Sequence, residues 1–483
     1  GVNTAESEHM LKWTIGGFAR EFYERMGKYY RENAARQDPL APGDRLHTIY
    51  FFESHVAEKV YLDLLREAGV EIRYGQRVNR VVKDNARLAA VTLTDGARLS
   101  AKVFIDASYE GDLMARSGVN YTFGREARAE YNEDAAGVRF DRSVRRGATV
   151  DEQGKLIPGI SAWSKELTEG DAHPAVMNYN FRLTGTKKLS NQAPIPQPTR
   201  YDRKRFRLLE NWLREKTASG EKVTIRDLFG VYQRRNGKFE INNQQDAIIS
   251  LGNFGAQFDW PDGTYTQREK IYEDHKEYTL GLIHFLRTEP VVPQHIQKEI
   301  GSWGFAKDEF PDNGHFPYQL YVREARRMKG AIVVTQTDVT TDRRKPDTIG
   351  ISSHFIDSHH VQRVALSRTE FANEGRIWRI GWAYQIPYRA LTPKAEEATN
   401  LLVPCAASFS HVAYCTLRLE SVWMITGQAA GMAAATVARS GTAIQNIDIP
   451  ELQEKLRAQR QIVDFIPGAP ERFEHGTGGH PEF

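Results

Sequence analysis

Residues 400–435, NLLVPCAASFSHVAYCTLRLESVWMITGQAAGMAAA, decide the fold of this chain more than any other stretch. Residues 401–403 are continuously apolar, which is typical of a short strand buried on both faces. A loop that contains His411 follows, and a helix rich in Gly and Ala comes next. Each isolated Gly inside a helix costs about 1 kcal/mol relative to Ala, so this composition indicates close packing or contact with a ligand. The stretch predicts a strand–loop–helix unit of an α/β protein.

A second landmark lies nearer the start of the chain. Residues 78–83 and 88–94 are predicted strands, and Asp95-Gly96 is a strong hairpin signal that leads the chain back near Leu99. Residues 103–105 again lack polar alternation, as expected of a strand buried on both faces, and the polar turn 106–112 ends them. This region predicts a meander that leads into a buried strand, with a further strand at 70–74.

Helical periodicity marks the N-terminal region and parts of the middle. Helices are predicted at 15–32, with Phe18, Phe22 and Met26 on one face, and from Ser54 to Gly69. In the middle of the chain, the pattern predicts helices at 202–216, 266–287, 293–302 and 318–328, strands at 329–339 and 376–383, and loops at 191–198 and 236–243.

The length and amino-acid composition of the chain limit the classes of protein to which it can belong. The 483 residues suffice for one large α/β domain with insertions or for two domains. The 65 Lys and Arg exceed the 62 Asp and Glu by 3 and are spread along the chain, so nothing indicates a nucleic-acid partner. No apolar run approaches the roughly 20 residues of a membrane span. Cys405 and Cys415 are too few for a disulfide framework or a cysteine-based zinc site. We expect a soluble protein, cytoplasmic or periplasmic, of open oligomeric state.

Several long segments resemble a large bacterial family of FAD-dependent oxidoreductases with the glutathione-reductase-like flavoprotein fold. Besides residues 400–435, they are IGGFAREFYERMG (15–27), VFIDASYEGDLMARSGVNYTFGRE (103–126), KDEFPDNGHFPYQLYVREARRM (307–328), IDSHHVQR (356–363) and YQIPYRALTPK (384–394). The resemblance spans almost the whole chain. It implies an α/β fold with a discontinuous, Rossmann-like FAD-binding domain, residues 1–125 and 395–483, and an inserted α+β substrate domain, residues 126–394.

The resemblance also implies which residues contact FAD. In such flavoproteins, the turn after the buried strand meets the cofactor, and a C-terminal helix directs its N-terminus at the flavin. The expected contacts are therefore Asn3 and Thr4 in an N-terminal loop, Ala107, Ser108, Glu110 and Asp112 in the turn, and Arg418, Gly427, Gln428, Ala429 and Ala430 at the helix. Free backbone N–H groups at the helix N-terminus would stabilise the negative charge of the reduced flavin.

One part of the family pattern is missing. No G-x-G-x-x-G follows a strand in the 483 residues. The family's phosphate loop and first strand are expected before Gly1. We therefore expect a flavoenzyme chain that lacks the N-terminal phosphate-binding βαβ unit, and with it the main anion site of the cofactor.

Oxidation of a substrate by a flavin needs a base for the proton of the adjacent O–H or N–H group. His411 is the first candidate, and His359 and His360 are the next. Arg389 is predicted to hold a carboxylate or polar group of the substrate or to stabilise the reduced flavin, the alternative being an ion pair between domains. The group His354, Asp357, His359 and His360 matches no common zinc spacing, so no metal is predicted. The charged run 323–327 is by default a solvated or inter-domain surface, and the alternative that the resemblance leaves open is a buried role for Arg323 and Glu324.

The sequence thus predicts an FAD-dependent oxidoreductase that acts by hydride transfer on a small polar substrate, with carbohydrate-like compounds weakly favoured. The alternatives are a non-catalytic binding protein that keeps the fold without FAD and, more remotely, a polysaccharide lyase. Residues 70–112 should pack against residues 400–440, because both landmarks are expected to meet at one cofactor.

Overall fold

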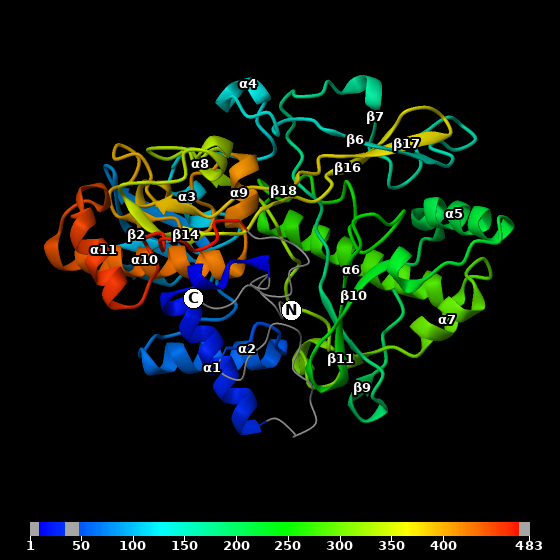
Figure 1. Ribbon diagram of the computed structural model, residues 1–483, viewed down its shortest axis with the longest axis horizontal. Coiled ribbons are helices and arrows are strands. Elements are labelled where there is room, and N and C mark those ends of the chain that lie inside the picture. The colour runs from blue at the N-terminus through cyan, green and yellow to red at the C-terminus, as the bar shows by residue number, and fades with distance from the viewer. Residues whose placement is uncertain (1–8, 34–47, 473–483) are drawn as a thin grey trace.

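The computed structural model describes residues 9–33 and 48–472 of the chain, and they form a mixed α/β protein with several small sheets. Figure 1 shows the two ends of the chain on the same side: α1 and α2, in blue, lie near α10 and α11, in orange and red. The middle of the chain, with α5, α6 and α7 in green, lies on the other side.

The N-terminal helices are those that the sequence predicts. They are α1 (Gly17–Asn33) and α2 (Ser54–Glu67). α1 buries Phe22 and Met26, and it packs against α2 and against α10 (Glu420–Ser440), so the apolar stripe of α1 joins the two ends of the chain.

The meander also forms as predicted. β1 (Val78–Asp84), β2 (Arg87–Leu93) and β3 (Arg98–Ser100) pair antiparallel in that order, and the chain turns at Asp95 and Gly96. β4 (Phe104–Ile105) then pairs in parallel with β20 (Leu401–Leu402). The side chain of Asn400 receives a hydrogen bond from Leu88 N and donates to Leu88 O, each at 2.9 Å. The expected contact between the two landmarks is confirmed.

The middle of the chain is built on a five-stranded antiparallel sheet in the order β10-β11-β8-β12-β9. Its strands are β8 (Leu183–Thr186), β9 (Gln192–Ala193), β10 (Phe229–Gln233), β11 (Lys238–Asn243) and β12 (Gly304–Ala306). The helices α5 (Arg207–Ala218), α6 (Tyr265–Thr288) and α7 (Gln294–Gly301) lie close to the predicted positions and share one apolar core with this sheet.

Smaller elements complete the fold. A four-stranded sheet consists of β6 (Phe140–Arg146), β17 (Glu370–Glu374), β16 (Gln362–Ala365) and β7 (Ala162–Trp163). Two-stranded sheets pair β5 (Tyr121–Thr122) with β13 (Arg327–Met328), β14 (Thr348–Ser352) with β19 (Tyr384–Pro387), and β15 (Ile356–Asp357) with β18 (Trp378–Ile380). The remaining α-helices of the described residues are α3 (Asp112–Arg116), α4 (Arg128–Tyr131), α8 (Gln336–Thr340), α9 (His411–Leu417) and α11 (Ile449–Ala458).

The two largest apolar cores of the described residues follow from this arrangement. The first combines α1, α2, α9, α10 and α11 with side chains between Val334 and Leu391. The second lies between the five-stranded sheet and α5–α7. Within residues 9–33 and 48–472, no helix combines the length and the apolar character that crossing a bilayer requires.

Some predicted elements are wrong. Residues 70–74 form no strand, and Val70 and Tyr74 are 50% and 73% exposed. Residues 318–328 form no helix, residues 329–339 form no strand, and the predicted loop at 236–243 contains β11. Ile105 is 38% exposed, so β4 is buried on one face rather than both. Among the described strands, the parallel pairs are β4–β20 and β16–β7. These two pairs do not make up the extended parallel sheet of a Rossmann-like domain.

Candidate functional site

A cavity of about 730 Å³ lies at the carboxyl end of β4. One of its walls is the turn after the strand and includes Ala107, Ser108, Glu110 and Asp112, four of the residues that the sequence places at the cofactor. Another wall comes from α6 and the loop before it, through Trp260, Tyr265, Arg268 and Tyr272.

The turn is held in shape by the buried carboxylate of Asp106. This carboxylate accepts hydrogen bonds from Ser108 N (3.1 Å), Ser108 Oγ (2.6 Å) and Met114 N (2.8 Å), and its burial raises its pKa. Gly111 has φ +65°, and a Cβ there would lie 2.7 Å from Met114 Cε and 3.0 Å from Ala406 Cβ. The cavity wall is therefore preformed by local hydrogen bonds and by a glycine that no larger residue can replace without strain.

Two acids of this wall have opposite electrostatic environments. Burial raises the pKa of Glu110, whose Oε1 accepts a hydrogen bond from Trp260 Nε1 at 3.2 Å. Burial also opposes ionisation of Asp112, but Arg268 and Arg326, each 2.8 Å from its carboxylate, outweigh burial and lower its pKa. Asp112 is thus a fixed anion with two arginine partners, whereas Glu110 retains hydrogen-bonding capacity toward the cavity.

A second cavity, of about 400 Å³, shares Tyr318 with the first. It lies at the first turn of α10, where Glu420 forms part of its wall together with Arg182. Tyr109, from the turn after β4, also lines it and packs on Trp423 with ring centroids 4.8 Å apart. The tyrosines of this wall are Tyr61, Tyr74, Tyr109, Tyr318 and Tyr321.

The predicted position of the N-terminus of the Gly/Ala helix is wrong. α10 begins at Glu420, so Gly427, Gln428, Ala429 and Ala430 lie two turns inside it, where backbone N–H groups already bond within the helix. Ala429 and Ala430 are buried, and Gln428 Oε1 accepts a hydrogen bond from Phe18 N at 2.9 Å. The helix turn that faces the tyrosine-lined cavity is the one that contains Glu420.

His411 is the first residue of α9 and is 1% exposed. Its Nδ1 lies 2.8 and 3.0 Å from the carboxylate oxygens of Glu324, and its backbone N–H donates to Glu126 at 2.9 Å. Arg327 forms ion pairs with both of these acids. Nε2 of His411 has no hydrogen-bond partner among the described residues. Because a carboxylate only accepts, Nδ1 carries a proton, and in a neutral imidazole Nε2 then carries the lone pair.

The other histidines of the group 354–360 have separate environments. His360 Nε2 lies 2.8 Å from Asp141 Oδ2, and His354 Nδ1 lies 2.7 Å from Phe355 O. His359 is half-buried, and burial together with nearby arginines holds its pKa well below the usual value. His354 and His360 therefore contact different partners.

The remaining predicted site residues lie apart from one another. The side chain of Arg389 is 52% exposed and pairs with Asp347 at 2.9 Å. Arg418 is buried, and its guanidinium contacts Asp357 Oδ2 at 3.0 Å. Asn3 and Thr4 lie outside the described residues.

A family profile described as FAD dependent oxidoreductase matches residues 1–456. The chain belongs to this family. FAD is therefore its cofactor, and the protein is a flavin oxidoreductase. No curated protein matches the chain.

The lining of the larger cavity fits part of FAD. Carboxylates such as that of Glu110 can accept hydrogen bonds from the hydroxyl groups of the cofactor, and Trp260 and Tyr265 offer aromatic faces to its rings. The cations of the lining are Arg77, which pairs with Glu269 at 2.6 Å, and Arg268, which pairs with Asp112. The residues of this flavoprotein that are described thus suit the hydroxyl-bearing and aromatic parts of FAD better than its diphosphate.

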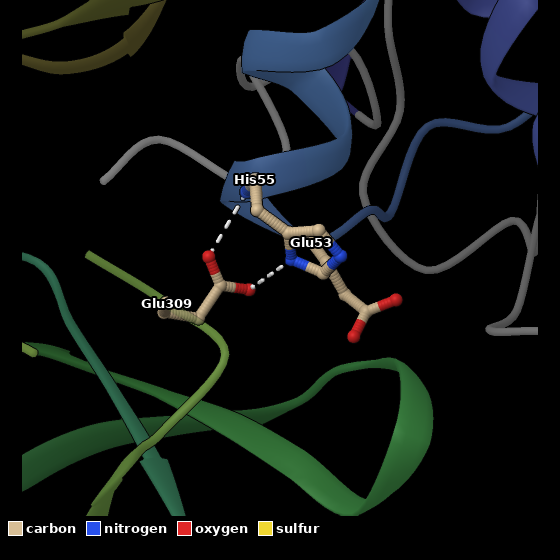
Figure 2. Close-up of side chains that lie close together, drawn as sticks. All are labelled: Glu53, His55 and Glu309. Atoms are coloured by element: carbon tan, nitrogen blue, oxygen red, sulfur yellow. Dashed lines mark hydrogen bonds and ion pairs between the residues drawn. The ribbon is translucent and has the colours of Figure 1, made fainter. Parts of the chain in front are cut away.

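The oxidoreductase also contains an ion cluster that sequence reasoning missed. Ligand-type atoms of Glu53, His55 and Glu309 lie within 4.8 Å of one another (Figure 2). The Lys238 ammonium lies 2.7 Å from Glu53 Oε1, 2.9 Å from Glu309 Oε1 and 2.8 Å from Asp308 Oδ2. The Lys238 ammonium thus lies between the acids, where a metal ion would otherwise bind. Its ion pair with Glu53 links the start of α2 to β11. The members of the cluster come from three segments far apart in the sequence, so no sequence spacing could have revealed it.

His55 gives this cluster a pH dependence. Burial disfavours the imidazolium, but Glu309, 3.1 Å from Nδ1, outweighs burial and raises the pKa of His55; Glu53 acts in the same direction, and Lys238 opposes it. A raised pKa stabilises the folded state below the unfolded pKa of about 6.5, and this contribution disappears as the pH rises through the folded pKa. The unfolding free energy of wild type minus that of His55→Gln should therefore be larger at pH 5.5 than at pH 8.5. Urea titrations at several pH values measure this difference, and a difference that grows with pH would contradict the prediction.

Proposed function

We propose that this flavin oxidoreductase oxidises a small polar, carbohydrate-like substrate by hydride transfer. The observation that carries the proposal is the pair of adjoining cavities that share Tyr318. One has the acid-containing turn after β4 as a wall, and the other combines tyrosines with the first turn of α10. The larger cavity has the size of a cofactor site, and the smaller one has the size of a site for a small molecule.

In this proposal, Ala107, Ser108, Glu110 and Asp112 hold the cofactor on the wall of the larger cavity. Ser108 and Asp112 are already ordered by Asp106 and by two arginines, so they lose little freedom when FAD binds. The sequence predicts that residues 427–430 contact the cofactor. In this proposal, the first turn of α10 makes that contact instead, because the positive end of the helix dipole lies there.

The side chains that line the tyrosine-lined cavity support the proposal of a polar substrate. Tyrosine rings give apolar contact to the faces of a sugar-like ring, while their hydroxyl groups form hydrogen bonds with its hydroxyls. Arg182 and Glu420 add one cation and one acid to the same wall. Such a lining favours a substrate with several hydroxyl groups over a purely apolar one.

We assign the base to His411. When bound, FAD supplies the acceptor for the hydride that leaves the substrate carbon. His411 Nε2 takes the proton of the hydroxyl group on that carbon, because Glu324 holds the ring proton on the opposite nitrogen. Arg327 fixes the position of Glu324, so Glu324 and Arg327 are positioning residues.

Anaerobic reduction of the purified flavoprotein tests the proposal. Hydroxylated compounds such as aldoses, alditols and aldonates are mixed with the enzyme, and the flavin absorbance is followed over time. We expect at least one of these compounds to reduce the enzyme, whereas apolar alcohols of similar size do not. If only apolar alcohols reduce it, the substrate class is wrong.

The alternative of a non-catalytic binding protein is less favoured, since the family to which the chain belongs is FAD dependent. It predicts that the purified protein contains no FAD. A yellow protein that releases one FAD per chain on denaturation would exclude it.

Glu110 provides a test of the cofactor assignment. Glu110→Ala should weaken retention of FAD by about 10- to 100-fold, because a hydrogen bond to a charged group contributes about 1.5–3 kcal/mol. Fluorescence of FAD released on dilution of the holoenzyme measures the change. Glu215→Ala, an exposed position on α5, is the control. Equal retention in both variants would remove Glu110 from the site.

A further inference from the structure

The two adjoining cavities are separated in part by the turn after β4. Successive side chains of this turn alternate between them: Ser108 and Glu110 line the larger cavity, whereas Tyr109 lines the smaller one. Tyr109 is fixed, because its ring packs on Trp423. The backbone of Ser108 is also fixed, since its N–H donates to the buried carboxylate of Asp106. This part of the wall between the cavities is therefore rigid.

Tyr318 forms another part of the same wall. Among the described residues, it is the one that lines both cavities. It is also 44% exposed, so it borders the two cavities and the solvent at once. Because the turn after β4 is rigid, a molecule that extends from one cavity into the other passes the ring of Tyr318.

The loop before Tyr318 has a strained backbone. Phe310 and His315 have φ of +47° and +64°, a left-handed conformation that bulky side chains rarely adopt. Phe310 is 8% exposed, lines the smaller cavity and meets the ring of Tyr318 edge to face, with centroids 5.1 Å apart. The hydroxyl group of Tyr318 donates a hydrogen bond to Asp312 Oδ1. Such strain persists where surrounding contacts impose it, and it is concentrated at functional sites, so this loop places Tyr318 at the wall.

We propose that Tyr318 determines which substrates reach the cofactor, because its ring limits the width of the passage between the two cavities; this inference rests on the proposed function. In that function, the substrate occupies the smaller cavity and the cofactor the larger one, and reacting atoms must approach to about 3–3.5 Å. The substrate therefore has to extend past Tyr318, and the width that the ring leaves open sets the largest substrate that does so. Tyr318 is thus a specificity-determining residue, and Phe310 and Asp312 are positioning residues.

Binding of a size series to the holoenzyme tests the proposal. The series is glycerol, glucose and maltose, which share their hydroxyl chemistry and differ in size. Binding is read from the flavin absorbance spectrum and from the shift in melting temperature, neither of which requires turnover. The wild type should bind glucose more tightly than maltose. In Tyr318→Ala, the ratio of the two affinities should fall about 10-fold, a change at the lower end of what shape-based discrimination achieves in binding pockets.

A second readout does not depend on the substrate class. Iodide quenches flavin fluorescence by collision, so the quenching constant reports access to the cofactor. It should rise in Tyr318→Ala, whereas Tyr318→Phe, which keeps the ring and its contact with Phe310, should retain most of the wild-type behaviour in both readouts. Tyr232→Ala is the matched control, because Tyr232 is 49% exposed on β10 and lines neither cavity.

The results separate this inference from the proposed function. An unchanged affinity ratio or an unchanged quenching constant in Tyr318→Ala overturns the role of Tyr318, and so do equal changes in Tyr232→Ala. If Tyr318→Ala does not fold, Tyr318→Trp carries the test: the larger ring should lower the quenching constant, and an unchanged value overturns the inference. A quenching constant that rises in Tyr318→Ala, in an enzyme that no hydroxylated compound binds to or reduces, would instead overturn the proposed function and leave the passage at Tyr318 standing.

Discussion

His411→Ala is expected to slow reduction of the enzyme by its substrate about 10²–10⁴-fold, the usual effect of losing a general base. The reason is geometric: Glu324 occupies Nδ1, and Nε2 is the ring nitrogen left to receive a proton. FAD should remain bound, because His411 does not line the larger cavity. Anaerobic stopped-flow measurement, with a compound that reduces the wild type, gives the rate constant.

His275→Ala is the matched control for the loss of a buried imidazole. His275 is 1% exposed, its Nδ1 contacts Ile271 O at 2.8 Å, and its Nε2 has no partner among the described residues. It should lose stability but keep the reduction rate. A rate in His411→Ala equal to that of the wild type would take His411 out of the mechanism and leave His359 and His360 as candidates.

Lys238→Met is expected to lower the unfolding free energy by about 3–5 kcal/mol, the usual cost of breaking a buried ion pair by removing one partner. The side chains of Lys238 and Glu309 are fully buried, and that of Glu53 is 2% exposed. Without the ammonium, two buried carboxylates face each other near His55. Burial opposes the charge of Lys238, but Glu309 and Glu53 outweigh burial and raise its pKa, which shows how closely these charges are coupled.

Urea unfolding and the melting temperature measure this loss. Lys329→Met is the control, since Lys329 forms an exposed ion pair with Glu130 at 3.1 Å and should cost no more than about 1 kcal/mol. A similar small loss in Lys238→Met would show that the cluster contributes little to the joint between α2 and β11.

The parts of the fold that the sequence predicts well are those with local causes. The Asp95-Gly96 turn and the alternating strands on either side specify the meander, and apolar spacing specifies α1, α2 and α5–α7. The pairing of β4 with β20 is also predicted, although it joins distant segments. In that case, the continuously apolar sequence of both segments indicated buried strands, and the family resemblance indicated that the two strands lie side by side.

The wrong predictions share one physical reason: whether a segment forms a strand depends on another strand that can pair with it. Residues 70–74 have a strand-like composition, but no strand of the described residues pairs with them, and they stay exposed. Residues 238–243 look polar enough for a loop, yet they form β11 between β8 and β10 because both neighbours pair with it. The composition of a segment does not indicate which other segments of the chain will lie beside it in the fold.

The site shows the same division. The sequence by itself determined that an acid-containing turn follows a buried strand, that His411 precedes a small-residue helix, and that the chain resembles FAD-dependent enzymes. The tertiary structure alone decided that α10 begins at Glu420, that Glu324 and Arg327 form a buried ion pair, and that Arg323 is buried against the backbone of Asn178. Burial of a charged run depends on counter-charges and carbonyls that come from remote segments, and only folding brings those groups to it.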